Sequence, residues 1–185
     1  MEIQLVRPTL KHRDEALRFR EEFYRNGEPV INGSEMLDRM ESYEEWLRCV
    51  DRNSDPATVS PDWVVTDTFF ALDNEDRIVG IIDFRHELKG FLTDFGHCGY
   101  SVRPCERKKG YATKMLAKII TVAKAAGLPS LSLSVERTNT PSVKTIIRNG
   151  GKYERSFEWE GETADVYRIL LATDGIPAGR KGEKE

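Results

Sequence analysis

The segment from Val102 to Ala112 constrains the structure and function of this chain more than any other part of its sequence. It reads Val-Arg-Pro-Cys-Glu-Arg-Lys-Lys-Gly-Tyr-Ala, so a run of basic side chains leads into Gly110 at the predicted start of a helix. A glycine lets the backbone approach a ligand closely, and the free N–H groups of a helix N-terminus favour an anion. Basic side chains add hydrogen bonds worth about 1.5–3 kcal/mol each. The segment therefore predicts a binding site for a pyrophosphate group.

The residues after this loop predict an amphipathic helix and then a strand. Apolar residues at i, i+3, i+4, i+7, i+8 and i+11 form one stripe of the helix, namely Ala112, Met115, Leu116, Ile119, Ile120 and Ala123. Gly127 and Pro129 end the helix. Serine then alternates with leucine and valine over 130–135, which predicts a strand with one apolar face.

A second helix is predicted to begin in the following Asn-Thr-Pro-Ser segment. Asn139 or Thr140 can cap it, and Pro141 suits its first turn. Ile146 and Ile147 are its predicted buried side, and two consecutive glycines end it.

Other phosphate-binding motifs fit the loop less well. An NTPase phosphate loop requires Gly-Lys-Ser/Thr, whereas this loop has Gly-Tyr-Ala and offers no hydroxyl for Mg²⁺. A dinucleotide fingerprint requires further glycines around Gly110. A nucleic-acid partner is disfavoured by the net charge of −3 and the pI near 5.8. A solvated basic turn at the start of an ordinary helix is the simple alternative.

The spacing within the loop resembles the acetyl-CoA signature of the GNAT superfamily of N-acetyltransferases, V-x-P-x-x-(Q/R)-x-x-G-x-(G/A). The matching residues are Val102, Pro104, Arg107, Gly110 and Ala112. The order of elements from about 95 to 151 is similar to motifs A and B of that superfamily. A wider pattern resembles a bacterial branch of predicted acetyltransferases whose substrates are mostly unassigned. It runs through 5–9, 43–46, 85–86, 97–104 and 149–151, within residues 3–171.

The resemblance implies an α/β (α+β) fold with a single acyl-CoA N-acyltransferase domain over residues 1–172. In that fold a mixed, mostly antiparallel sheet of about seven strands carries helices on both faces. Two central parallel strands, expected here at 95–102 and 130–135, splay apart and admit the pantetheine arm of the cofactor. Residues 173–185 are rich in glycine and charge and are expected to form a disordered tail.

Periodicity, caps and turns predict the other elements. Further strands are expected at 3–7, 63–72, 78–85, 152–159 and 164–171, with 63–72 and 78–85 as one hairpin and the last two as another. Further helices are expected at 11–24 and 42–50. The inner face of the first is predicted to carry Ala16, Phe19 and Phe23, and a capping box of Ser42 and Glu45 opens the second.

Length and composition fit one globular domain, with 185 residues, 32% of them charged and 39% hydrophobic. We expect no transmembrane helix, because no apolar run reaches about 18 residues, and hence no membrane partner. The N-terminus lacks the pattern of a signal peptide, which favours a cytoplasmic protein. Cys49, Cys98 and Cys105 are expected to be reduced, and no metal site is expected because cysteines and histidines do not come together at ligand spacing. Dimerisation is common in the superfamily, and the sequence leaves a homodimer open.

The resemblance also implies that acetyl-CoA is the co-substrate. Its predicted binding residues are Tyr100, Ser101, Val102, Arg107, Lys108, Lys109, Gly110, Tyr111, Ala112, Thr113, Asn139 and Ser142. A backbone N–H near Tyr100 to Val102 is expected to polarise the thioester carbonyl.

A general base is expected, because a primary amine with a pKa near 10.4 is mostly charged at pH 7 and freeing its lone pair costs about 4–5 kcal/mol. His97 is the first candidate, since many members of the superfamily place a catalytic Glu close to this position and a His titrates near neutrality. His86 and Glu136 are the other candidates. Asp94 is weaker, and His12 is expected to be exposed.

The general acid is harder to assign. Many relatives carry a Tyr seven residues after the Asn of motif B, and this chain has Ile146 there. Tyr100, Tyr111, Tyr153 or solvent could protonate the leaving thiolate instead. Cys98 is disfavoured as a covalent nucleophile, because a cysteine is more often a small core residue.

The acceptor is expected to be a small cationic amine. Residues 28–62 hold nine acids and three basic groups, and residues 153–165 hold five acids and one Arg. The corresponding segments line the acceptor cleft in the superfamily, where an acidic rim would steer a cation inward, although surface acids also serve solubility. Trp46, Trp63 and Trp159 either line the cleft or pack in the core. The alternatives are a protein lysine or N-terminus as acceptor, a non-catalytic acyl-CoA-binding module, and a structural partner protein.

Overall fold

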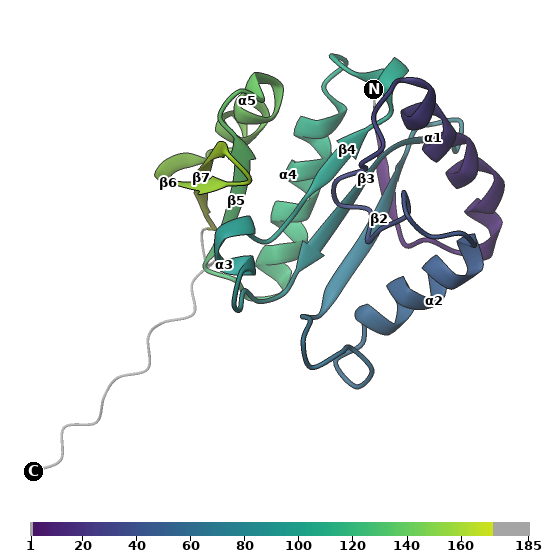
Figure 1. Cartoon of the computed structure of the whole chain (residues 1–185), viewed down its shortest axis with the longest axis horizontal. Coiled ribbons are helices and arrows are strands. Elements are labelled where there is room, and N and C mark those ends of the chain that lie inside the picture. Colours follow the sequence, from purple (N-terminus) through teal and green to yellow (C-terminus); the bar gives the residue numbers. More distant parts are fainter. Residues whose placement is uncertain (1, 172–185) are drawn as a thin grey trace, which may run out of the picture.

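The computed structural model describes residues 2–171, in which helices flank seven strands (Figure 1). The strands are β1 (Gln4–Val6), β2 (Thr66–Leu72), β3 (Ile78–Arg85), β4 (Tyr100–Val102), β5 (Ser130–Glu136), β6 (Lys152–Trp159) and β7 (Glu162–Leu170). The α-helices are α1 (Arg13–Arg25), α2 (Tyr43–Asn53), α3 (Leu92–Phe95), α4 (Tyr111–Ala125) and α5 (Thr140–Arg148). Short 3₁₀ turns cover Leu10–His12 and Pro104–Glu106. The expected tail over 173–185 lies outside the described residues.

The strands form two antiparallel sheets. One has the order β1-β2-β3-β4 and the other the order β5-β7-β6. The mixed α/β fold of about seven strands is therefore confirmed, and both predicted hairpins are present as β2–β3 and β6–β7. Within residues 2–171 the sheets join through an isolated antiparallel bridge between Gly96 and Leu133. Beyond this bridge β4 and β5 diverge (Figure 1), so the expected splay is present but a parallel ladder is not.

Two apolar cores hold the helices against the sheets. α1 and α2 cover one face of β1–β4, where Phe19, Trp46 and Phe70 are fully buried. α4 packs between the opposite face and the β5–β7 sheet, where Met115 and Leu131 are fully buried. Burial of each large apolar side chain contributes about 1.5–3 kcal/mol. These cores fix the positions of β4, α4 and β5, from which the candidate site is built.

The strand predicted over 95–102 is wrong in its first half. Leu92–Phe95 is the short helix α3, and regular strand begins only at Tyr100. Gly96 separates the two with a φ of 82°, and a Cβ on it would lie 2.4 Å from the carbonyl oxygen of Ser132. Only a glycine fits this close approach of the two sheets in a left-handed conformation.

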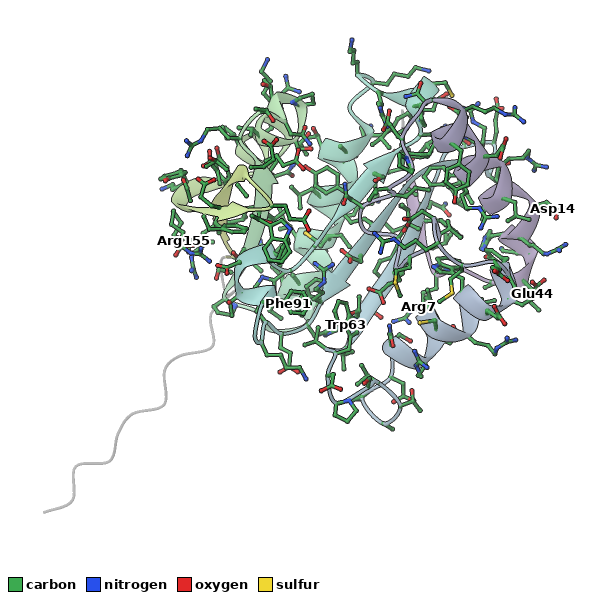
Figure 2. All side chains as sticks on the ribbon, viewed as in Figure 1. Arg7, Asp14, Glu44, Trp63, Phe91 and Arg155 are labelled. Carbon is green, nitrogen blue, oxygen red and sulfur yellow. The ribbon has the colours of Figure 1, made fainter. Side chains whose placement is uncertain are left out.

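Three smaller predictions are also wrong. Ile147 is 54% exposed, because only Ile146 of that pair faces the core. His12 is buried, and its Nδ1 accepts a hydrogen bond from the backbone N–H of Thr9 at 3.0 Å. β2 begins at Thr66, since Trp63 turns away to pack on Phe91 with the ring centroids 6.1 Å apart (Figure 2).

The cap of α2 is as predicted in that Ser42 accepts from the N–H of Glu45.

Candidate active site

The predicted phosphate loop leads directly into α4. Gly110 is the N-cap residue with a φ of 86°, and no side chain caps the helix. The first N–H groups of α4 therefore point out of the helix end without a side-chain acceptor. Lys108 also adopts a left-handed φ of 64°, which is uncommon outside glycine. Backbone strain of this kind occurs often at functional sites. The loop thus presents backbone donors and a positive helix end at one point.

A cavity opens above this loop, between β4, the start of α4 and the start of α5. All the predicted cofactor residues except Lys109 line it. Lys109 instead binds Glu106, with its Nζ 2.9 Å from Oε2. The amide of Asn149 donates to the carbonyl oxygen of Thr113 at 3.2 Å, which ties the end of α5 to the start of α4. The cavity is therefore held open between two fixed helices.

The basic side chains of the loop are not equally available to a ligand. Arg107 binds both carboxylate oxygens of Glu28 and also donates from Nε to the carbonyl oxygen of Val102 at 3.2 Å. Its guanidinium carbon lies 5.5 Å from the ring centroid of Phe23. Within residues 2–171 the side chain of Lys108 has no such partner and lines the cavity. Arg107 therefore braces the loop, while Lys108 is available to an anion.

Sequence reasoning missed part of the cavity wall. Pro141, Lys144, Thr145 and Arg148 line it from α5. Their spacing of i, i+3, i+4 and i+7 places them on one helical face, and this pattern could have identified them. The segment between α1 and α2 also contributes Glu28, Val30 and Asn32. No local pattern in that segment indicates that it folds over the loop.

The backbone of β4 offers further donors on the cavity side. The odd-numbered residues of this segment face β3. The carbonyl of Gly99 accepts from the N–H of Asp83 at 3.1 Å, and the N–H of Arg103 donates to the carbonyl of Val79 at 2.9 Å. Successive N–H groups of a strand point to opposite sides. The N–H groups of Tyr100 and Val102 therefore point into the gap between β4 and β5.

A second cavity, of about 310 Å³, adjoins the first. Asn32, Tyr100, Asn139 and Ser142 line both cavities. The second cavity is also lined by Glu136 at the end of β5 and by residues of α3 and of the β6–β7 hairpin. The two cavities therefore lie side by side, with these four residues at their common border.

The three proposed bases occupy different places. Glu136 is exposed and lines the second cavity. His86 lies outside both linings, with its Nε2 2.9 Å from Oδ2 of Asp67. His97 also lies outside both linings, and its Nδ1 accepts from the N–H of Ser132 at 2.9 Å. Burial lowers the pKa of His97. This geometry ties His97 to the junction of the sheets.

The candidate proton donors also lie in different places. Tyr100 lines both cavities, its hydroxyl lies 3.5 Å from the carbonyl oxygen of Ser142, and burial raises its pKa to about 12. Tyr153 is 58% exposed on β6. Ile146 is a core residue of α5 at 1% exposure. Cys98 lines the second cavity, but burial raises its pKa, which keeps it a neutral thiol.

A family profile described as an acetyltransferase (GNAT) domain matches residues 3–152. The chain belongs to the GNAT acetyltransferase family. The resemblance carried by the loop signature is therefore confirmed over most of the chain. The comparison with curated proteins finds no match.

Solved GNAT acetyltransferases share the fold. RimL, a ribosomal L7/L12 α-N-protein acetyltransferase in complex with coenzyme A, is 13% identical with a TM-score of 0.69, over 93% of this chain and 96% of that one. The microcin C7 self-immunity acetyltransferase MccE, in complex with acetyl-CoA and AMP, is 16% identical with a TM-score of 0.69, over 92% and 93%. A GNAT acetyltransferase from Streptococcus pneumoniae is 17% identical with a TM-score of 0.66, over 92% and 100%.

Within residues 2–171 no helix has the length and apolar content of a membrane span. Over the same residues no three His, Cys, Asp or Glu side chains lie close enough together to hold a metal ion.

Proposed function

We propose that this GNAT protein is an N-acetyltransferase that moves the acetyl group of acetyl-CoA to a primary amine of a small cationic acceptor. The observation that carries the proposal is the pair of adjoining cavities with four lining residues in common, Asn32, Tyr100, Asn139 and Ser142. One cavity has the features of an anion site, and the other is open to a second molecule. Two substrates meeting end to end is the geometry that direct group transfer requires.

In this proposal the first cavity holds acetyl-CoA. The N–H groups at the start of α4 bind the pyrophosphate, as helix N-termini commonly do. Lys108, Lys144 and Arg148 line the same cavity and supply positive charge for its phosphates. The N–H groups of Tyr100 and Val102 face the thioester and stabilise the negative charge that develops on its carbonyl oxygen.

The chemistry is a direct attack. The amine nitrogen forms a bond to the carbonyl carbon, the carbon–sulfur bond breaks, and the amine loses one proton while the thiolate of CoA gains one. Glu136 lines the acceptor cavity and takes the amine proton, directly or through water. Tyr100 lines both cavities and, with a pKa raised to about 12, still carries the proton that the thiolate needs. A neutral Cys98 thiol favours direct attack over a covalent acyl-enzyme.

The size of the second cavity supports a small acceptor. Its volume of about 310 Å³ is at the lower end of the range for small-molecule sites. RimL and MccE, which share this fold, are an α-N-protein acetyltransferase and a self-immunity acetyltransferase. A protein N-terminus is therefore the alternative acceptor that a test must include.

We place the enzyme in the cytoplasm, where acetyl-CoA is available to it.

The test has two parts. Isothermal titration with acetyl-CoA measures binding, and release of free CoA thiol measures transfer to a panel of amines, amino sugars and peptides. We expect micromolar binding and turnover of one class of small amine. Binding without turnover of any amine would support a non-catalytic acyl-CoA module instead, and absence of binding would overturn the assignment of the first cavity.

A further inference from the structure

The face of the β5–β7–β6 sheet that borders the second cavity has a distinctive set of side chains. Cα partners across an antiparallel pair share a face, and the register pairs Glu136 with Ala164, Ala164 with Phe157, and Glu162 with Trp159. Glu136, Phe157, Trp159 and Glu162 all line the cavity. One sheet face therefore presents two carboxylates and two aromatic rings to the acceptor.

The turn of the hairpin fixes a third carboxylate at the mouth. Glu160 and Gly161 are the two turn residues, with φ values of 49° and 84°. Positive φ at both positions is the conformation of a tight two-residue hairpin turn. Glu160 lines the cavity as well. The turn therefore holds this carboxylate beside Trp159.

The side chains of these three carboxylates have no bonded partner within the described residues. Over residues 2–171 the side chains of Glu136, Glu160 and Glu162 form neither ion pairs nor hydrogen bonds, whereas Asp165 on the opposite face of the sheet binds Arg137 at 2.7 Å. The cavity does contain a cation of its own, Arg85. Its guanidinium is paired, because Nη2 lies 2.6 Å from Oδ2 of the buried Asp83, and it is one cation beside three carboxylates. The cavity therefore has an excess of negative charge.

Three aromatic side chains, Phe95, Phe157 and Trp159, form one wall of the second cavity. Phe95 of α3 contacts Phe157 and Trp159 edge to face, with ring centroids 5.9 and 4.9 Å away. Trp159 is nevertheless 49% exposed. One ring of this wall already binds a cation, since the guanidinium carbon of Arg155 lies 5.8 Å from the centroid of Phe157 (Arg155 is labelled in Figure 2). Arg155 is itself paired with Asp94 at 2.7 Å. The exposed part of Trp159 is open to a further cation.

The two carboxylates at the ends of this wall, Glu136 and Glu162, are separated by about the length of a short diamine. Glu136 and Glu162 lie on neighbouring strands and are offset by two residues along the sheet. Strand spacing and rise per residue place their Cα atoms about 8 Å apart. The backbone carbonyl of Glu136 accepts from the N–H of Asn139 at 2.9 Å, and Asn139 lines both cavities. Trp159 and Glu162 instead flank the hairpin turn.

From this arrangement we infer that the acceptor is a diamine or polyamine. Its reacting amine lies at Glu136, and its second, charged ammonium group binds between Trp159 and the carboxylates of Glu160 and Glu162. This inference rests on the proposed acetyl transfer and adds a second cation site to it. A monoamine of the same length places an uncharged methyl group at the mouth, so the mouth selects by charge.

The test compares two amines that differ in one charge. Initial rates of thiol release at saturating acetyl-CoA are measured for putrescine and for butylamine, together with a short peptide carrying a free N-terminus. We expect kcat/KM for putrescine to exceed that for butylamine at least about tenfold, since an ion pair and a cation–π contact together are worth about a factor of ten. Equal values for the two amines, or a faster peptide, would overturn the diamine assignment while leaving acetyl transfer in place.

Variants locate the second cation. Glu162→Gln and Trp159→Leu should each reduce the putrescine-to-butylamine ratio about three- to tenfold, mainly through KM for putrescine. Glu158→Gln is the matched control, because Glu158 lies on the same strand but the opposite face and binds Thr163 at 2.8 Å. An unchanged ratio in both test variants would overturn the site. Titration of acetyl-CoA on every variant separates the two proposals, because loss of acetyl-CoA binding bears on the proposed function and loss of the ratio alone bears on the diamine site.

Discussion

Arg107 and Glu28 form a two-point ion pair in the wall of the first cavity, with Nη1 2.6 Å from Oε1 and Nη2 2.5 Å from Oε2. Both residues line the cavity, so the acid that holds Arg107 also places a negative charge where phosphates are proposed to bind. Hydrogen bonds from Arg107 lower the pKa of Glu28, which keeps this charge in place at neutral pH.

Removing that charge should strengthen cofactor binding. We expect Glu28→Gln to lower the Kd for acetyl-CoA about three- to fivefold, because Arg107 is then free to approach a phosphate. Isothermal titration measures this directly. Glu21→Gln is the control, since Glu21 lies on α1 outside the lining of the first cavity and pairs with Arg25 at 3.0 Å. Weaker binding in Glu28→Gln would mean that Glu28 is needed to position Arg107.

Two substitutions of Gly110 distinguish the effect of negative charge from the effect of backbone conformation at the proposed phosphate site. A Cβ at this position meets nothing within 4 Å, and Asn and Asp share the same backbone strain at the left-handed φ of 86°, which they adopt more readily than other side chains. We expect Gly110→Asn to fold and to bind acetyl-CoA with a modest loss. Gly110→Asp should fold equally well but bind about a hundredfold more weakly, because its carboxylate faces the pyrophosphate. Similar affinities for the two variants would contradict an anion site here.

The proposed role of Glu136 as general base predicts a particular pH profile. We expect Glu136→Gln to lower kcat/KM about 10²- to 10⁴-fold at pH 7, where the amine must be deprotonated. The loss should shrink near pH 10, because the free amine is then already abundant. Rates with one accepted amine over this pH range provide the measurement. If His97→Asn lowers kcat/KM at pH 7 more than Glu136→Gln does, His97 rather than Glu136 is the general base.

Tyr100 should matter more for the chemical step than for binding. We expect Tyr100→Phe to lower kcat about a hundredfold while changing the Kd for acetyl-CoA less than about threefold, because the hydroxyl protonates the departing thiolate. Tyr153→Phe is the control, since Tyr153 is exposed on β6 and its hydroxyl lies 2.8 Å from Oγ of Ser156. Equal kcat values for the two variants would assign the proton to solvent.

His97 should make stability depend on pH. Burial lowers the pKa of His97 in the folded protein below its usual value of 6.5, so the unfolded chain binds a proton at higher pH than the folded one does. Its contribution is complete above pH 6.5 and is lost as the pH falls below it, at a slope of at most about 1.4 kcal/mol per pH unit. We expect thermal denaturation midpoints between pH 7.5 and 5 to fall more steeply in the native protein than in His97→Asn, whose amide oxygen can still accept from Ser132. Parallel curves would contradict this.

The sequence determined the parts of the molecule that depend on local pattern. The apolar stripe of α4 predicted Met115, Leu116, Ile119 and Ala123, all of which are buried. The Asn-Thr-Pro-Ser segment predicted the N-cap of α5, where Asn139 accepts from the N–H of Ser142 at 3.2 Å. These features follow from helical periodicity and from the unsatisfied N–H groups of a first turn, which involve only neighbouring residues.

Contacts between segments far apart in the chain decided the rest. The close approach of the Ser132 carbonyl requires a glycine at position 96, where α3 ends. Arg107 is bound by an acid that stands 79 positions earlier in the chain. Glu136, Trp159 and Glu162 meet only through the register of β5, β6 and β7. A sequence pattern specifies which face a residue takes within its own element. The pairing of elements decides which faces meet, and that pairing assembled the second cavity.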